Sequence, residues 1–206
     1  MKKKLTLVIA TLGCLMNLTA CSESSDFISW NEEVKLNDNR MIIVTQKKKC
    51  EGGEKVTANG FPYCIARETW LTINLPEFSK QPIVWHEKLH PMIINIVGGR
   101  LYVVGTPPTL AEYRFYENPE PYFVGFIWEN ENWKRIKFNE IPEVIYDANM
   151  LFSNIPIKGT KLLTWDVKWS EKLNGGSEYS ASSFRKRIDP KYITGYPQLY
   201  KPSPNK

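Results

Sequence analysis

The stretch Met92-Ile-Ile-Asn-Ile-Val97-Gly98-Gly99-Arg100-Leu-Tyr-Val-Val-Gly105 decides the fold class of this 206-residue chain. Two apolar runs of strand length are joined by two glycines, a residue type that accepts the positive φ angles of a tight turn. Apolar runs as short as these are too short to span a membrane. The sequence therefore predicts a β-hairpin over 92–105.

Similar patterns lie on both sides of this hairpin. Apolar and polar residues alternate from Trp30 to Leu36, and Asn37-Asp38-Asn39 supplies a turn into a second alternating run. Glu32 falls on the apolar side of the first run, between Trp30 and Val34, so we expect it to face inward. Strands outside 92–105 are predicted at 30–36, 40–46, 69–75, 82–85, 122–129, 133–138 and 164–170.

Two short helical segments are predicted among the strands, at 110–116 and 142–152. In the second, Pro142 occupies a favoured first helical position, and apolar residues follow at three- and four-residue spacing. Every tryptophan lies in or beside a predicted strand, which favours a sheet core built from aromatic cross-strand pairs. We therefore expect a mainly β fold: a single antiparallel sandwich-like or curled-sheet domain of about eight strands in successive hairpins, with one or two short helices.

The beginning of the chain has the parts of a secretory signal. Three lysines at 2–4 precede a short apolar run over 5–15, and Leu18-Thr19-Ala20-Cys21 closes the segment. The run is too short to cross a bilayer as a stable helix, so residues 1–20 are predicted to be a signal peptide. Leu18–Cys21 resembles the lipobox of bacterial lipoproteins, and the resemblance implies that Cys21 is acylated and becomes the first mature residue.

The same resemblance implies a location. In this class an aspartate after the acylated cysteine retains a lipoprotein in the inner membrane, whereas Ser22 here implies the periplasmic face of the outer membrane. Residues 21–26 form the lipidated linker, and its five residues 22–26 reach at most about 18 Å, so the domain is expected to lie against its bilayer. The alternation from Trp30 to Val44 behind a lipobox resembles small uncharacterised lipoproteins of proteobacteria, which implies no activity.

Charge and cysteine content narrow the classes of partner. The net charge of +5 includes the three signal lysines, so cleavage before Cys21 would leave +2, and no nucleic-acid partner is predicted. Cys50 and Cys64 remain after lipidation, and in an oxidising compartment they are expected to form a structural disulfide. The alternative is a redox pair, which usually has Cys-x-x-Cys spacing. The enclosed loop is a candidate binding element or simply a stable turn.

Two basic groups are candidate binding residues. Lys47, Lys48 and Lys49 end a predicted strand, where we expect a solvated sheet edge; the alternative is contact with lipopolysaccharide phosphates or lipid head groups. The β-rich domain is predicted over 27–170, followed by a basic irregular tail over 171–206 with a net charge of +4. This tail could instead contact an anionic envelope polymer or an acidic partner through Arg185, Lys186 and Arg187.

His86-Glu87-Lys88-Leu89-His90 matches the H-E-x-x-H pattern of zinc metalloproteases, in which one helix carries both metal ligands and the catalytic glutamate. Pro91 disfavours a helical conformation at His90, and strand-like residues lie on both sides. We therefore expect a strand that ends in a turn, with His86 and His90 as weak metal candidates.

Motifs of other enzyme classes are missing: the sequence contains no G-x-S-x-G elbow, P-loop or dinucleotide fingerprint. No catalytic residue and no cofactor is predicted. The first hypothesis is a non-catalytic, lipid-anchored envelope protein that binds a protein or an anionic envelope polymer. One alternative is an immunity lipoprotein that neutralises a toxin delivered into the periplasm. The other is a zinc hydrolase that uses His86, Glu87 and His90.

Overall fold

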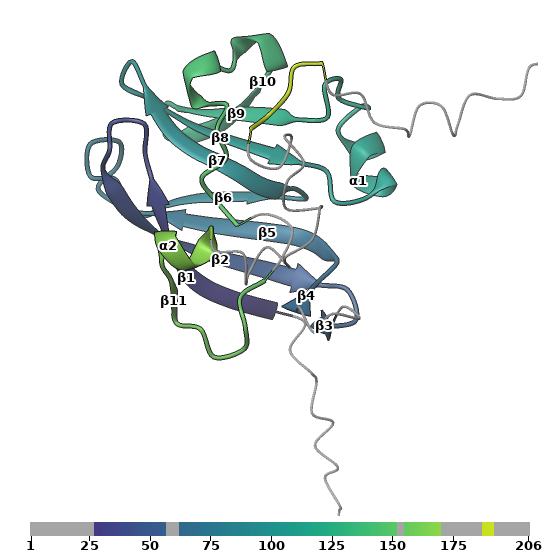
Figure 1. Cartoon of the computed structure of the whole chain (residues 1–206). Coiled ribbons are helices and arrows are strands. Elements are labelled where there is room, and N and C mark those ends of the chain that lie inside the picture. The colour runs from purple at the N-terminus through teal and green to yellow at the C-terminus, as the bar shows by residue number, and fades with distance from the viewer. Residues whose placement is uncertain (1–26, 57–61, 152–154, 170–186, 192–206) are drawn as a thin grey trace, which may run out of the picture.

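Two sheets built almost entirely from antiparallel strands form the body of the protein. The computed structural model describes residues 27–56, 62–151, 155–169 and 187–191. In Figure 1 the four-stranded sheet lies above the five-stranded sheet, with β10 near the top and β11 at the bottom. The expectation of a mainly β fold with two short helices is confirmed, since the described helices are α1 (Leu110–Phe115) and α2 (Trp165–Lys168).

The five-stranded sheet is built around the first predicted hairpin. β1 (Phe27–Lys35) and β2 (Met41–Cys50) pair along their length, and the chain turns between them at 36–40. The strand order is β11-β1-β2-β5-β6, and only the β1–β11 pair is parallel. The remaining strands of this sheet are β5 (Ala66–Ile73), β6 (Ile83–Glu87) and β11 (Leu162–Leu163). A separate pair, β3 (Lys55–Val56) with β4 (Pro62–Tyr63), lies between β2 and β5 in the chain.

The four-stranded sheet contains the hairpin over 92–105. β7 (His90–Val97) and β8 (Arg100–Thr106) meet at Gly98 and Gly99, whose φ angles of 55° and 72° suit glycine. β9 (Val124–Glu129) and β10 (Asn132–Ile136) form the second predicted hairpin, and the strand order is β10-β9-β8-β7. Both hairpins were predictable because apolar alternation and turn residues agree in each.

A shared apolar layer holds the two sheets together. Alternate residues of β1, β2, β5 and β6 contact residues of β7, β8 and β9 across it. Trp85 of β6 meets Phe126 of β9 edge to face, with ring centroids 5.7 Å apart. Burial of this layer supplies the main driving force for folding. Its fully buried members include Val34, Val44, Leu71, Ile73, Trp85, Ile94, Leu101 and Val103.

A second apolar cluster covers the other face of the four-stranded sheet. The 3₁₀ helices η1 (Phe138–Glu140) and η2 (Glu143–Ile145) follow β10 and bring Ile141 and Ile145 against this face. Ile188, from the described part of the C-terminal segment, packs in the same cluster, and its amide donates to the carbonyl of Tyr146.

Two predicted elements are wrong. The strand expected at 164–170 is instead α2, preceded by the two-residue strand β11. The alternation of Trp165, Val167 and Trp169 suggested a strand, but Thr164 caps a helical turn by accepting from the Val167 amide. Trp165 and Trp169 therefore lie at a helix rather than in the sheet.

The helix expected over 142–152 shrinks to the single turn η2. Beyond it, Met92 holds the chain in an extended path, since its carbonyl accepts from the amides of Asn149 and Met150. The Asn149 side chain binds the backbone of both Lys35 and Ile94, so this segment joins the two sheets. Tertiary hydrogen bonds have replaced helical ones here.

Candidate functional site

The lysine run does not form a solvated sheet edge. β2 is an interior strand, paired with β1 on one side and β5 on the other. Side chains alternate across a strand, so Lys47 and Lys49 are exposed on the outer face whereas Lys48 is fully buried. The expected edge is therefore wrong, and the three lysines cannot act as one binding surface.

Lys48 lies in an unusual environment for a cation. Its Nζ sits 5.4 Å from the centre of the Trp30 ring, and Glu32 lies on the neighbouring strand. Burial lowers the pKa of Lys48 to about 7, although the negative charge of Glu32 acts in the opposite direction.

Glu32 faces inward, as expected from its position between Trp30 and Val34. Its carboxylate accepts from Trp30 Nε1 at 3.0 Å, from the Leu151 amide at 3.3 Å and from Lys168 Nζ at 3.4 Å. Lys168 Nζ also donates to the carbonyls of Glu33 and Asn149. These bonds attach α2 to β1, so the buried pair has a structural explanation.

The H-E-x-x-H segment has no helix. His86 is the fourth residue of β6 and His90 the first of β7, with a turn between them. The His86 ring is exposed, stacks on Trp70 at 4.3 Å and contacts a Glu68 carboxylate oxygen at 2.9 Å. His90 has a buried Nδ1. The predicted strand and turn are confirmed.

Glu87, the catalytic residue in the metalloprotease pattern, accepts instead from the Tyr116 hydroxyl at 2.7 Å. Burial raises the pKa of Glu87, and this hydrogen bond acts in the opposite direction. Within the described ranges, no three metal-ligating side chains gather at one point. The helix that the metalloprotease pattern needs through all five residues is therefore not formed at 86–90.

The disulfide and Arg187 occupy different parts of the molecule. Cys50 and Cys64 are bonded, with a Cα–Cα distance of 5.4 Å, and they close the loop that carries β3 and β4. Arg187 forms ion pairs with Asp147 and Glu143 on the segment around η2. Cys21, Arg185 and Lys186 lie outside the described residues.

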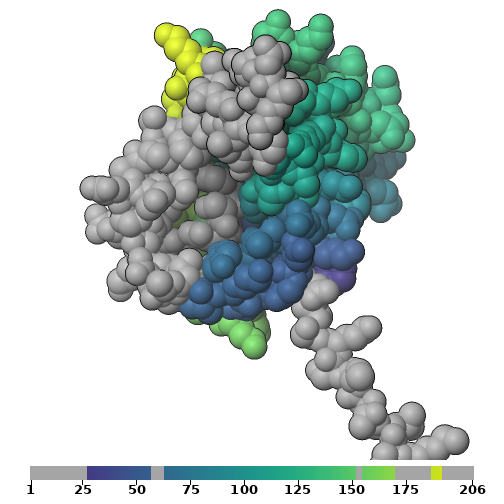
Figure 2. All heavy atoms as spheres, turned by 90° about the vertical axis from the view of Figure 1, so that its right-hand side faces the viewer, coloured from purple at the N-terminus to yellow at the C-terminus, as the bar shows by residue number. Residues whose placement is uncertain are grey.

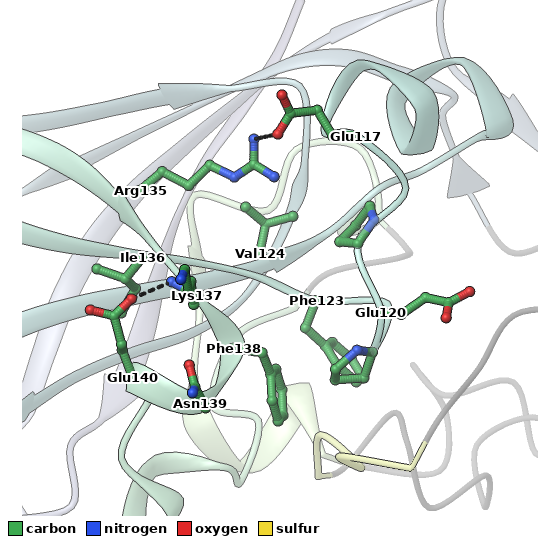
Figure 3. Close-up of a pocket in the computed structure, with 12 residues that line it drawn as sticks. Glu117, Glu120, Phe123, Val124, Arg135, Ile136, Lys137, Phe138, Asn139 and Glu140 are labelled. Carbon is green, nitrogen blue, oxygen red and sulfur yellow. Dashed lines mark hydrogen bonds and ion pairs between the residues drawn. The ribbon is translucent and has the colours of Figure 1, made fainter.

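A groove beside β10 and η1 is the site that the sequence did not reveal. It has a volume of about 720 Å³ and lies between the connection that precedes β9 and the segment that follows β10 (Figure 3). We call it the Phe138 groove. It is lined by Glu117, Pro119, Glu120, Pro121, Phe123, Val124, Arg135, Ile136, Lys137, Phe138, Asn139 and Glu140.

Aromatic and aliphatic side chains form the floor of the Phe138 groove. Phe123 and Phe138 face each other with ring centroids 6.1 Å apart, and Phe138 is only partly buried. Gly125 follows the lining residue Val124 in β9, and a Cβ atom there would come within 2.8 Å of Ile141 and 3.0 Å of the lining residue Ile136. The groove therefore depends on a close approach between β9 and the segment after η1.

Charged groups of both signs form the rim. Arg135 reaches the Glu117 carboxylate at 3.4 Å and donates to the Tyr116 carbonyl at 2.6 Å. At the other end, Glu140 accepts from the Lys137 amide at 2.8 Å (Figure 3), and the Lys137 side chain is exposed. Arg135 and Glu140 are thus held in place by contacts that a ligand need not supply.

The lining combines charged, amide and apolar side chains. Among its described residues are three carboxylates, two cations, the amide of Asn139 and apolar side chains. The signal in the sequence was weak: prolines at 119 and 121 marked a connection but did not show which strand it faces. The groove forms only when 117–124 and 135–140 meet in the fold.

No model of a protein family, no curated protein and no solved structure matches this chain. Within the described residues, neither helix has the length and apolar character needed to cross a bilayer.

Proposed function

We propose that this protein is a non-catalytic, lipid-anchored envelope protein that binds a segment of another protein in the Phe138 groove, at the periplasmic face of the outer membrane. The observation that carries the proposal is the groove itself, in which the partly buried ring of Phe138 lies among charged residues, two of them, Arg135 and Glu140, held by hydrogen bonds. A volume of about 720 Å³ falls within the size range of known ligand sites.

The groove favours a protein over an anionic polymer. Protein interfaces combine an apolar, aromatic centre with a polar rim, as Phe123 and Phe138 do here with their charged neighbours. Glu117, Glu120 and Glu140 outnumber Arg135 and Lys137 among the lining residues. A polyanion would be repelled by this balance, whereas a protein segment can match both signs.

The two groups of basic residues, 47–49 and 185–187, give little support to the alternative in which the partner is an anionic polymer. Lys48 is buried, Lys49 is paired with Glu68, and Arg187 is paired with Asp147 and Glu143. The described members of the two groups therefore do not join into one basic surface that a polyanion could follow.

The anchor is proposed from the lipobox resemblance of Leu18–Cys21 and from Ser22 after it. A Cys21→Ser variant should be unprocessed or released from the membrane and should incorporate no labelled palmitate. Fractionation of inner membrane, outer membrane and soluble protein checks this. An acylated Cys21→Ser protein, or one that fractionates with the outer membrane as the wild type does, contradicts the proposed anchor.

Binding in the groove is tested by site-specific crosslinking in intact cells. A photoreactive residue at Asn139, which is exposed on the rim, should capture a discrete protein, and the same residue at the exposed Lys80 should not. Lys137→Glu should lower the Asn139 adduct roughly threefold to tenfold, because a rim charge steers association. The substitution keeps the hydrogen bond from the backbone amide of residue 137 to Glu140, because that bond does not involve the lysine side chain.

The identity of the captured protein distinguishes a housekeeping binding role from an immunity role. A housekeeping envelope protein supports it directly, and a delivered toxin, with growth protection against that toxin alone, would assign the immunity role. Adducts from Asn139 that contain only bulk porins, or that match those from Lys80, would contradict a binding function for the groove.

A further inference from the structure

Three exposed apolar side chains gather at one end of the five-stranded sheet. Phe27 begins β1, Val56 ends β3 and Ile157 lies in the loop before β11; their exposed fractions are 43%, 62% and 66%. In Figure 1 the start of β1, the β3–β4 pair and this loop all lie at the bottom of the molecule, and the side view in Figure 2 agrees for β1 and the light-green residues after 154. We call this the Phe27 end.

Contacts between these segments show that they form one surface. A cavity of about 480 Å³ is lined by Phe27–Trp30 of β1, Gly53 and Glu54 of the disulfide-closed loop, and Pro156–Thr160. The Asn31 amide donates to the carbonyl of Lys161 at 3.2 Å, which holds the 156–161 loop against β1. The disulfide fixes the third segment at the end of β2.

Lysines surround the apolar residues. Lys158 and Lys161 are exposed in the loop, and Lys55, which precedes Val56 in β3, is half-buried. On the outer face of the sheet, Lys47 lies 4.4 Å from the Phe27 ring centre and 5.5 Å from that of Trp70. Two acids in the disulfide-closed loop oppose this charge: Glu51 is paired with Arg67, and Glu54 is exposed.

The position of the anchor indicates what this end contacts. Only residues 22–26 separate Cys21 from Phe27, and five extended residues reach at most about 18 Å. An acylated Cys21 would therefore keep the Phe27 end within about 18 Å of its lipid chains. Aromatic residues and lysine side chains with apolar stems are favoured at the boundary between lipid and water.

We infer that the Phe27 end docks on the bilayer: Phe27, Val56 and Ile157 enter the head-group region, and Lys55, Lys158 and Lys161 contact anionic phospholipid head groups. This inference rests on the proposed lipid anchor and adds an orientation to it. Burial of apolar side chains and attraction between lysines and anionic lipid act together in such contacts.

The test uses the full lipidated protein in vesicles of phosphatidylcholine with phosphatidylglycerol. An environment-sensitive fluorophore is placed at Ile157→Cys or, as the matched control, at Met41→Cys, while Cys50 and Cys64 remain bonded. Met41 is also exposed and apolar. It pairs with Lys35 at the opposite end of the β1–β2 hairpin, about 27 Å from Phe27 along the strands.

The label at 157 should emit at shorter wavelength than the label at 41. Its quenching constant for aqueous iodide should be lower by roughly threefold or more, because head groups exclude the quencher. Equal quenching at both positions in vesicle-bound protein would overturn the docked orientation. Protein that fails to float with the vesicles would contradict the anchor instead, so the two failures are distinguishable.

The role of the lysines is tested in the same vesicles. Lys158→Glu with Lys161→Glu should abolish the protection at position 157, whereas Lys80→Glu should leave it unchanged. Replacing phosphatidylglycerol by phosphatidylcholine should weaken the protection in the unaltered protein. If neither the charge reversal nor the removal of anionic lipid changes the protection at position 157, the proposed contact between the lysines and head groups is overturned.

Discussion

At the scale of single residues, the interior of the five-stranded sheet carries charge. Glu32, Lys48 and Lys168 are all buried, and the ammonium of Lys168 has three oxygen partners. A buried ion pair adds little stability over an apolar pair, but the loss of one partner leaves an unpaired charge in the interior. The cluster therefore makes the fold intolerant of single changes.

Lys168→Met should lower the free energy of unfolding by about 3–5 kcal/mol, because the buried Glu32 would lose the cation bound to it. Urea denaturation at neutral pH measures this. Glu32→Gln combined with Lys168→Met should recover much of the loss. A single variant within about 1 kcal/mol of the wild type would contradict the structural role of the pair.

Lys48 should make stability depend on pH. Below pH 7 the ammonium is charged in both states, whereas between pH 7 and about 10 the unfolded chain holds a proton that the folded chain has released. The contribution of Lys48 to the unfolding free energy therefore rises with pH, by at most about 1.4 kcal/mol per unit in this window. Lys168 acts in the same direction, since burial lowers its pKa as well.

Lys48→Met isolates this effect. The variant should lose the rise, so its stability relative to the wild type should fall steadily from pH 7 to pH 10. Urea denaturation of both proteins at several pH values checks the difference. Parallel curves for the two proteins would show that Lys48 has an ordinary pKa in the folded state.

At the scale of elements, the sequence predicted those segments in which local pattern and tertiary contacts agree. The hairpins around 36–40, 98–99 and 130–131 combine alternation with turn residues, and all three are present. The segment 164–170 failed because alternation over seven residues also fits one helical turn, and the cap at Thr164 decided between them. Local pattern could not show that the edge of β1 is filled by a strand from residues 162–163.

The candidate site was predicted less well than the fold. Alternation alone could have placed Lys48 on the other face of its strand from Lys47 and Lys49. The interior position of β2 in the sheet, however, depends on its pairing with β5. The Phe138 groove joins segments from both sides of the β9–β10 hairpin. Its shape depends on packing between them, and no periodicity within either segment encodes that.

Gly125→Ala should destabilise the protein by about 1–3 kcal/mol, because the new methyl group would overlap Ile141, with its Cβ 2.8 Å from Cγ1. Thermal or urea unfolding measures the loss. Ile141→Val in the same chain removes Cδ1, which would lie 2.9 Å from the new Cβ, and should restore part of the stability. An unchanged single variant would mean that β9 can move away from η1 freely.

Cys50→Ser with Cys64→Ser should lower the unfolding free energy by about 3 kcal/mol, as the chain-entropy account gives for a loop of about 15 residues. In the unaltered protein, thiol labelling after denaturation without reductant should find both cysteines blocked. Free thiols in that assay would contradict the bond between Cys50 and Cys64.

At the scale of the whole molecule, the Phe138 groove and the Phe27 end lie at opposite ends. β10 and η1 are near the top of Figure 1, whereas β1 begins near the bottom. If the Phe27 end rests on the bilayer, the groove is directed away from it, into the space that a soluble or peptidoglycan-side partner occupies. Anchoring and recognition then use separate surfaces and do not compete.

Residues 187–191 are also part of the folded molecule. Ile188 is buried against the four-stranded sheet, so Ile188→Ala should cost about 2–4 kcal/mol of unfolding free energy. Ile157→Ala is the matched control, since its side chain is exposed, and it should change the value by less than about 0.5 kcal/mol. Equal effects of the two substitutions would show that 187–191 does not contribute to the core.

The contact between Lys168 and Glu32 joins residues 136 positions apart. The β1–β2 hairpin can form, with Trp30 already bound to Glu32, before the residues that follow it are synthesised, but Glu32 lacks its cation and the edge of β1 lacks its neighbouring strand until residues 162–168 arrive. Contacts between such distant residues slow folding. The order of synthesis therefore leaves the earliest strand exposed the longest, and a chain interrupted before residue 162 retains an open sheet edge that proteases and other strands can engage.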